Sequence, residues 1–271
     1  MPRKKANRVI TQSNKLIEAK YSLTLGEQRI LLSVIAMIQP EDEDFRDYGV
    51  SLDEICRFLG IKNKNWRPEC QKITDRLRRR PLDIRENGKY IQTNWISRAS
   101  YFDEETSMVY IRFDPSLKPY LIQLKREFTQ ASLSTVLQLK SVYATRIYLL
   151  LKQYRSIGKR ALGLEEMREM LGIEKDQYAK YHDFKKRVIL AAQRELDRKT
   201  DIGFEFEEQK EGKGVVGIVF HIRDAIQEEP AQSNHTPIQP AVRKQSVVTE
   251  EQRQKAREGI DELKKTLRGK R

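Results

Sequence analysis

Cysteine and long apolar runs are scarce in this chain of 271 residues. The two cysteines, Cys56 and Cys70, are too few for a disulfide framework, and both fall in predicted helices, where small buried thiols are common. The most apolar stretch, Ile30 to Ile38, is far shorter than the roughly 20 residues of a membrane span. The basic start leads into polar residues, unlike a secretory signal. We therefore expect a soluble protein in a reducing cytoplasm, with no membrane partner.

Histidine is equally scarce, and this argues against several classes of enzyme. The three histidines, His182, His221 and His235, form no His-x-His pair of the kind that holds metal in a rolling-circle nicking endonuclease. The segment Gly212-Lys213-Gly214 lacks the spacing and the Ser or Thr of an ATP-binding loop. No His-x-x-Arg accompanies the tyrosines, as it does in a tyrosine recombinase. The sequence predicts no catalytic centre, no metal site and no cofactor.

Positive charge, by contrast, is in excess. Lys and Arg number 52 against 39 Asp and Glu, which gives a net charge of +13 and an isoelectric point near 9.6. Basic side chains that neutralise phosphates release condensed counterions, so such an excess favours a polyanionic partner. A surface charged only for solubility is the alternative, and composition alone leaves it open.

The first part of the chain has the element order of a winged helix. A capping box of Thr24 and Glu27 begins one helix, a second short helix ends at Gly60, and a third spans 66–80. Turn formers then separate segments rich in β-branched and aromatic residues, at 83–85, 90–100 and 108–113. Three helices followed by a small antiparallel sheet are typical of this fold.

The same pattern recurs further along the chain. A long helix predicted over 134–154 precedes the segment 164–173, which matches 52–61 in its apolar, acidic and Gly-Ile positions. The Gly-Ile pairs begin at 60 and 172, 112 positions apart, and the Arg-Ile pairs at 29 and 146 are 117 apart. A basic helix over 180–199 and two strand-like runs, 203–207 and 215–222, follow. The element order therefore repeats.

These features predict an α+β protein with two tandem winged-helix domains related by internal duplication, followed by a flexible tail. The expected boundaries are a basic N-terminal arm at 1–20, the first domain at 21–130, the second at 131–224, and a disordered or partly helical tail at 225–271.

The function is expected on the second helix of each helix-turn-helix pair, because this helix enters the major groove of DNA. At 100° per residue, one face of the first such helix carries Cys70, Ile73 and Leu77. The second carries an apolar stripe of Tyr181, Phe184, Val188, Ala192 and Leu196. The predicted DNA contacts lie outside these stripes and at the hairpin tip: Lys72, Arg76, Arg78, Arg79, Lys185, Lys186, Arg187, Gln193, Arg194, Arg198 and Lys213.

Side-chain chemistry divides these candidates. Arg suits bidentate contact with guanine and Gln with adenine, so Arg187, Gln193 and Arg194 are expected to contact bases. The lysines, Lys72, Lys185, Lys186 and Lys213, are expected to contact phosphate.

Two points on these helices stay open. The run Arg76 to Arg80 has an alternative role as a basic helix end that complements the helix dipole. Leu190 lies on the predicted outer face, where it contacts a thymine methyl group unless the helical phase is wrong by one residue.

Three groups of residues resemble motifs of a known family. They are TQSNKLIEA (11–19) with LGEQRIL (25–31), Phe113-Asp114-Pro115 with Leu117 and Leu121, and SVYATRIY (141–148). The family is that of the theta-type plasmid replication initiators of the RepB/RepE class, and the similarity covers roughly residues 7 to 224.

The resemblance implies binding to iterons, which are direct repeats at a plasmid origin, as a monomer. It implies melting of an adjacent AT-rich segment, recruitment of the host initiator and replicative helicase, and self-repression as a dimer on an inverted repeat. The second domain would make the more base-specific contacts, and the first would contact DNA or form the dimer interface. A tandem winged-helix transcriptional regulator and a DNA-processing enzyme are the alternatives.

Overall fold

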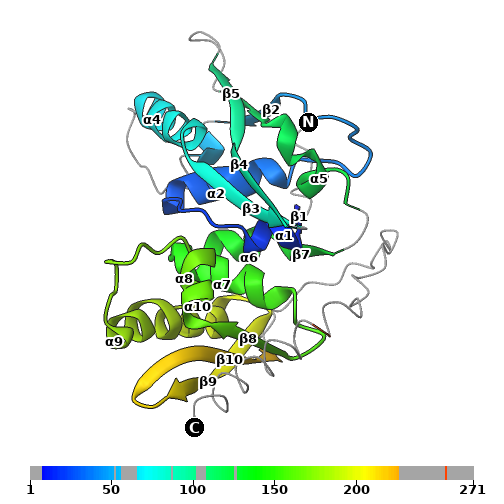
Figure 1. Ribbon diagram of the computed structural model, residues 1–271. Helices are drawn as coiled ribbons and strands as arrows, with labels where there is room; N and C mark the ends of the chain where they lie inside the picture. The colour runs from blue at the N-terminus through cyan, green and yellow to red at the C-terminus, as the bar shows by residue number, and fades with distance from the viewer. Residues whose placement is uncertain are drawn as a thin grey trace.

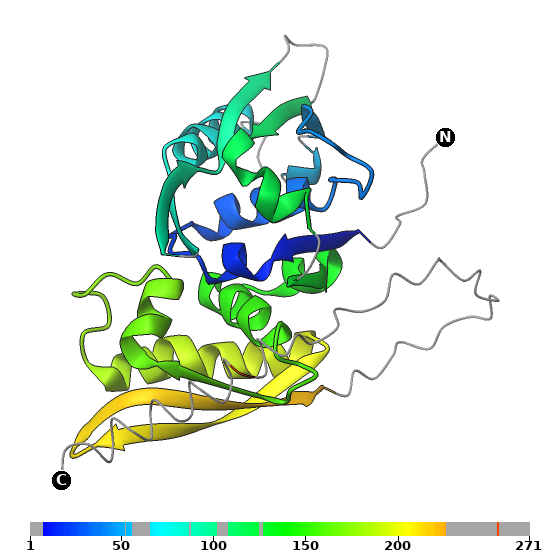
Figure 2. The same cartoon turned by 45° about the vertical axis from the view of Figure 1, so that its right-hand side comes forward.

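The computed structural model describes residues 8–51, 53–55, 66–86, 88–101, 108–124, 127–225 and 254. Two units are stacked along the long axis of the molecule, the N-terminal one above the C-terminal one in Figure 1, and the helix α7 (Val142–Lys152) lies between them. The view turned by 45° shows the same stacking (Figure 2). The short helix expected to end at Gly60 lies mostly outside the described residues, as do Cys56 and all of the tail beyond Ala225 except Gln254.

The first unit contains a three-stranded antiparallel sheet in the order β2-β6-β5. Its elements are α2 (Leu25–Ile35), β2 (Tyr48–Ser51), α4 (Trp66–Arg78), β3 (Pro81–Glu86), β4 (Lys89–Asn94), β5 (Ile96–Tyr101) and β6 (Met108–Phe113). The capping box that begins α2 is formed as expected, since Thr24 accepts from the Glu27 amide and Glu27 accepts from the Thr24 amide.

The second unit repeats this topology with the sheet order β8-β10-β9. Its elements after α7 are β8 (Lys159–Gly163), α8 (Leu164–Met170), α9 (Tyr181–Phe184), a π turn (Lys185–Ile189), α10 (Leu190–Lys199), β9 (Ile202–Glu211) and β10 (Gly214–Asp224). Helices α2 and α7 are both 11 residues long, and the first strand of each sheet pairs with the third. The predicted pair of winged helices is confirmed.

Among the described residues, the first unit has a hairpin that the second lacks. In the first, the two-stranded hairpin β3–β4 stands between the basic helix and the sheet, with Gly88 in its turn at φ 74°. In the second, α10 is followed directly by β9. The inserted hairpin reaches back to the start of the chain, where Lys20 pairs with Asp83 in an isolated bridge.

The expected N-terminal arm is wrong from residue 8 onward. The strand β1 (Val9–Ser13) pairs with β7 (Phe128–Ser132), and the short helix α1 (Asn14–Glu18) follows it. Ile10, Leu16 and Ile17 are buried in the core. The segment is polar on average, but its few apolar residues are spaced to fill the core, so composition alone hid the strand and the helix.

The single long helix predicted over 134–154 is also wrong. Leu139 is extended and ends α6 (Leu133–Gln138), and Ser141 then caps α7 by accepting from the Ala144 amide at 3.3 Å. Helix α6 contacts α2 and β7, whereas α7 contacts α10 most extensively. We therefore propose that the units meet at 139–141 rather than at the expected 130/131. Between β6 and β7, the chain forms the 3₁₀ turn Pro115–Leu117 and the short helix α5 (Lys118–Leu121).

No helix among the described residues is long and apolar enough to cross a membrane. In the same residues, no group of three or more His, Cys, Asp and Glu side chains is arranged to hold a metal ion.

Candidate nucleic-acid interface

The basic helix of the first unit, α4, packs on the core by the predicted face. Cys70, Ile73 and Leu77 are buried, and Thr74 hydrogen-bonds the Tyr101 hydroxyl on β5 at 2.6 Å. Lys72, Arg78 and Arg79 are exposed on the other side. The sheet and α2 thus fix which face of α4 meets solvent.

Several cations of α4 already have acidic partners. The Glu27 carboxylate is fully buried; its oxygens lie 3.1 Å from Arg76 Nε and 3.3 Å from Arg80 Nε. Because a buried carboxylate without a cation is strongly destabilising, Arg76 has a structural role. Two arginines of this basic run thus pair with Glu27, for which the sequence predicted only a capping box.

The outer cations of α4 are held more loosely. Lys72 lies 3.9 Å from Glu69 within α4, and Arg79, directly after α4, lies 2.9 Å from Asp75; both cations are exposed. Such surface pairs contribute about 0–1 kcal/mol and exchange readily for a phosphate. Arg78 is exposed and has no ion pair with any residue in the described parts of the chain.

The basic helix of the second unit runs through α9, the π turn and α10 without a break. Tyr181, Phe184 and Val188 form one stripe at helical spacing, and Ile189, Ala192 and Leu196 form a second. The π turn joins the two stripes one residue out of phase, so that Val188 and Ile189 are both buried. The predicted core face is therefore nearly right, but Ile189 was missed.

This change of phase bears on the question left open at Leu190, which is partly buried rather than fully exposed. The change of phase also determines which side chains point outward before and after the π turn. Lys186 lies midway between Phe184 and Val188, and Arg194 lies midway between Ala192 and Leu196. Both side chains consequently point away from the core.

Four predicted contacts on this helix are exposed cations that form no ion pair or hydrogen bond with the described residues: Lys186, Arg187, Arg194 and Arg198. No described carboxylate has to be displaced before these four bind an anion. They form the outer cation row of the second unit.

The other two predicted contacts on this helix are held by β9. Lys185 Nζ lies 2.7 Å from Glu208, which also accepts from Tyr181, and the Lys185 hydrogen bond is the main reason that the pKa of Glu208 lies below its usual value. Gln193 Nε2 donates to the Phe204 carbonyl at 2.8 Å. These contacts hold the helix on the sheet, although the sequence assigned both residues to DNA.

Lys213 is exposed at the tip of the β9–β10 hairpin, beside Gly212 at φ 58°. A hairpin of this kind is the wing of a winged helix, and its tip extends beyond the sheet. Lys213 is therefore placed where a phosphate could be reached, and its contact with DNA stays a prediction.

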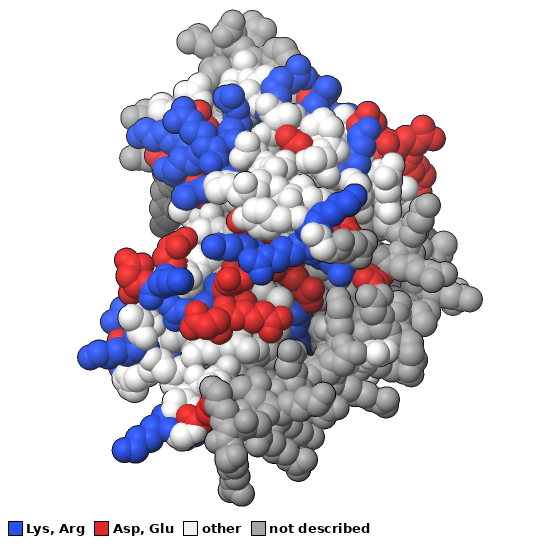
Figure 3. All heavy atoms as spheres, viewed as in Figure 1, with Lys and Arg blue, Asp and Glu red and all other residues white. Residues whose placement is uncertain are grey.

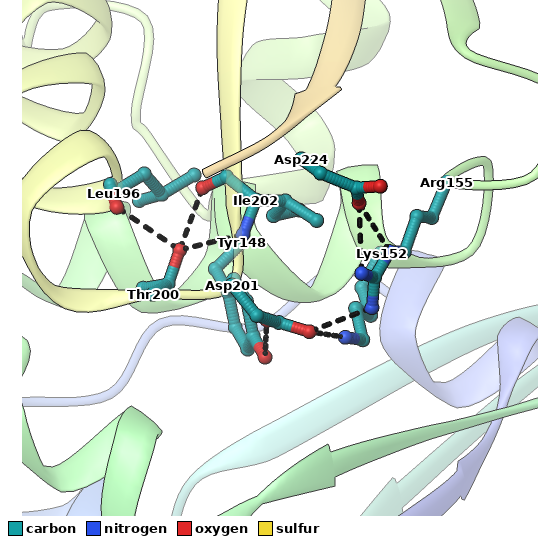
Figure 4. A network of polar contacts seen from close by, with 8 residues as sticks. All are labelled: Tyr148, Lys152, Arg155, Leu196, Thr200, Asp201, Ile202 and Asp224. Carbon is teal, nitrogen blue, oxygen red and sulfur yellow. Dashed lines mark hydrogen bonds and ion pairs between the residues drawn. The ribbon is translucent and has the colours of Figure 1, made fainter. Parts of the chain in front are cut away.

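A polar network fixes the end of α10 (Figure 4). Thr200 donates to the Leu196 and Ile202 carbonyls. The next residue, Asp201, accepts from Tyr148 at 2.9 Å and from Arg155 at 2.8 Å, and pairs with Lys152. Burial raises the pKa of Asp201, but these donors lower it more, so the net pKa lies below its usual value. Helix α7 thereby sets the position of the second basic helix.

On the face shown in Figure 3, Lys and Arg side chains gather over α4, whereas both signs of charge mix where the two units meet. A cavity of about 280 Å³ lies at this junction, lined by residues of both signs that include Glu18, Asp83, Glu166 and Glu169. On this face, positive charge is therefore concentrated over the basic helix and not at the junction.

The fold and the site define a class of protein. Two winged-helix units in tandem each present a basic helix, and these helices belong to the type that enters the grooves of double-stranded DNA.

Comparison with known proteins gives the family. The family model described as "Initiator Replication protein, WH1" matches residues 9–152, and "Initiator Rep protein, WH2" matches residues 163–222. The chain therefore belongs to the family of initiator replication (Rep) proteins. The first family model includes α7, the helix that in the structure lies between the units.

Individual relatives agree with this family. A "Replication initiation protein" of Escherichia coli is 27% identical over 190 residues, which are 66% of this chain and 57% of the relative. The "PI protein" of Escherichia coli is 27% identical over 158 residues, 52% of this chain and 51% of the relative. The chain thus spans little more than half the length of these relatives.

A solved structure supports the fold. The crystal structure of the Pi initiator protein in complex with iteron DNA matches with a TM-score of 0.66 at 20% identity, over 82% of this chain and 99% of that one.

Proposed function

We propose that this protein initiates plasmid replication by binding repeated double-stranded sites, iterons, at an origin. The outer cation row of the second unit carries the proposal, because four exposed and unpaired cations on the groove-entering helix of a winged helix have DNA as their natural partner. Membership of the initiator family and the similar fold of a protein solved with iteron DNA support it.

The two units divide the contacts between them. Arg187 and Arg194 contact bases in the major groove, where Arg pairs with guanine, while Lys186 and Arg198 contact the flanking phosphates. In the first unit, Lys72, Arg78 and Arg79 contact the backbone, and in the wing Lys213 does so. Lys185, Gln193 and Arg76 contribute mainly by positioning the helices, since each already has a protein partner.

Family membership supports the remaining steps of the proposal. The monomer binds direct repeats, promotes melting of the neighbouring DNA and recruits the host initiator and the replicative helicase in the cytoplasm. A dimer, formed through the first unit, represses the protein's own gene at an inverted repeat. The protein has no catalytic centre of its own.

The test uses the DNA that flanks the gene. We expect several direct repeats of about two helical turns, roughly 20 base pairs, because this is the span of two adjacent winged helices. The purified protein should protect each repeat from cleavage, and a plasmid with this fragment should replicate only when the protein is supplied. A chromosomal gene without repeats would contradict the proposal.

A transcriptional regulator with the same fold remains the alternative. Protection of an inverted repeat alone, without origin activity in the same cells, would favour it. Incubation of supercoiled origin plasmid with the protein, with and without divalent metal, tests the absence of catalysis. Nicked or covalently bound product would overturn that part of the proposal.

A further inference from the structure

Helix α7 is buried on every side at the centre of the molecule (Figures 1 and 2). Each residue from Ala144 to Leu151 is at most 2% exposed. A helix of this kind packs against neighbours all round. Here α7 contacts α1 and β7 of the first unit and α10 of the second.

Arg146 is a charged residue in this buried stretch, with 1% of its surface exposed. Its Nη2 donates to the Ala19 carbonyl of the first unit at 2.8 Å and to the Met170 carbonyl of the second. Its guanidinium lies over the Tyr21 ring, 3.6 Å from the centroid. One side chain thus bonds the backbones of both units.

The burial of Arg146 requires an explanation, because no carboxylate of the described residues forms an ion pair with it. Placing an unpaired cation in the interior is expensive, and a Met or Leu of similar volume would fill the space at lower free energy. An apolar side chain, however, cannot bond two carbonyls at once. Arg146 therefore fixes the positions of two backbone segments relative to each other.

Gly172 of the second unit packs closely against the backbone of residues 19–22. Its φ is 64°, and a Cβ atom there would lie 2.1 Å from the Tyr21 carbonyl oxygen and 3.0 Å from the Ser22 amide nitrogen. Only glycine combines this backbone conformation with so close an approach. The backbone at 19–22 is thus clamped between Gly172 and Arg146.

We call the contact of Arg146 and Gly172 with residues 19–22 the seam between the units, and a neighbouring arginine extends it. Arg160 of the second unit donates to Glu18 of the first at 2.8 Å, and a further bond, to the Leu150 carbonyl at 2.7 Å, holds the same guanidinium on α7. The chain itself passes between the units at 139–141, a short connection that would permit rotation. The side-chain contacts between the units oppose such a rotation.

We propose that Arg146 and Gly172 are positioning residues that fix the orientation of the two winged-helix units, so that both basic helices meet DNA at one separation and one helical phase. The proposal rests on the proposed function. The link to the second basic helix is direct, because Tyr148 and Lys152 of the same α7 hold Asp201 at the end of α10. A shift at Arg146 therefore moves the outer cation row relative to α4.

The test compares the wild type with Arg146→Met on two DNA fragments. One fragment is the natural site, and the other has five base pairs inserted between the two segments that the units protect. Half a helical turn places the second segment on the opposite face of the duplex. The wild type should lose at least about tenfold in affinity on insertion, since its units cannot follow this rotation.

Arg146→Met should bind the natural site about tenfold more weakly than the wild type does. The insertion should then reduce the affinity of this variant by a further factor of less than about three. Gly172→Ala should change the spacing dependence in the same direction, because its methyl group displaces Tyr21. The matched control is Arg98→Met, an exposed arginine paired with Asp47 far from the seam, which should keep the wild-type dependence.

Small-angle scattering of the free protein provides a readout without DNA. Arg146→Met and Gly172→Ala should retain cooperative unfolding and yet show a larger radius of gyration than the wild type and Arg98→Met. If both seam variants keep the wild-type scattering curve and spacing dependence, the proposal is overturned. If the wild type binds no DNA at all, the proposed function fails, and scattering alone then decides on the seam.

Discussion

The two basic helices occupy equivalent places in duplicated units but use their charge differently. On α4, Arg76 pairs with the buried Glu27, while Lys72 and Arg79 pair with acidic neighbours on the same helix. On the second helix, the outer cation row faces solvent without partners in the described structure. The first unit therefore commits positive charge to its own stability, and the second keeps its charge for a ligand.

This difference implies different consequences of mutation. Substitution of Arg76 should lower the free energy of unfolding more than it weakens DNA binding. Substitution of a residue in the outer cation row should weaken DNA binding and leave the free energy of unfolding unchanged. The predictions below test this contrast, in order of expected effect.

The largest effect is expected for the double variant Arg76→Ala/Arg80→Ala. It leaves the Glu27 carboxylate buried without a cation, which costs about 3–5 kcal/mol for a fully buried pair. Because both arginines are partly exposed, we expect about 2–3 kcal/mol, measured by urea denaturation. The control Arg78→Ala should lie within about 0.5 kcal/mol of wild type. Equal stability of the two variants would show that Glu27 does not depend on these arginines.

Arg194→Ala should have the opposite signature. We expect it to weaken binding to the specific site by about 1–3 kcal/mol, to relax preference at one base position, and to leave the unfolding free energy unchanged. Competition binding against a set of single-base variants measures this. Lys89→Ala, an exposed cation of the inserted hairpin, is the control. A uniform loss on every sequence would assign Arg194 to phosphate instead.

The features predicted well from the sequence are those that depend on local periodicity. The core face of α4, the capping box at Thr24 and the repeated element order all follow from spacing within a short window. The wrong prediction of an N-terminal arm, in contrast, concerns a contact that is distant in sequence. Nothing near β1 shows that it pairs with β7, over a hundred residues away.

The exposure of the candidate contacts was predicted in part, for the same reason. Exposure of Arg187 and Arg194 follows from the helical pattern, whereas the capture of Lys185 and Gln193 by β9 depends on tertiary packing. One signal in the sequence did indicate the π turn. An apolar Leu190 on the outer face, directly after Val188 and Ile189, shows that a single helical phase cannot place every apolar residue inside.

A smaller effect on stability is expected when acid protonates Asp201, which lies in the polar network at the end of α10. The folded pKa of Asp201 lies below its unfolded value of about 3.9, so its stabilisation is present above that pH and is lost as pH falls through the folded pKa. Since the side chain is 37% exposed, we expect about 1 kcal/mol after screening. Asp201→Asn should be less stable than wild type by this amount at pH 7.

The difference between Asp201→Asn and wild type should then shrink below about pH 4 and vanish once the wild-type carboxylate is protonated. Urea denaturation across this range measures it. If the stability difference between the two proteins stays constant down to the lowest pH, the hydrogen bonds of Asp201, rather than its charge, stabilise this network.

The smallest effect is expected for Lys72→Ala. Lys72 is 68% exposed and 3.9 Å from Glu69, so its loss should leave stability unchanged and weaken DNA binding by less than about 1 kcal/mol. Because a phosphate contact carries no sequence information, specific and random DNA should lose equal affinity, and the slope of log K against log salt should fall by about 1. A larger loss on the specific site would mean that α4 also contacts bases, which would remove the contrast between the two helices.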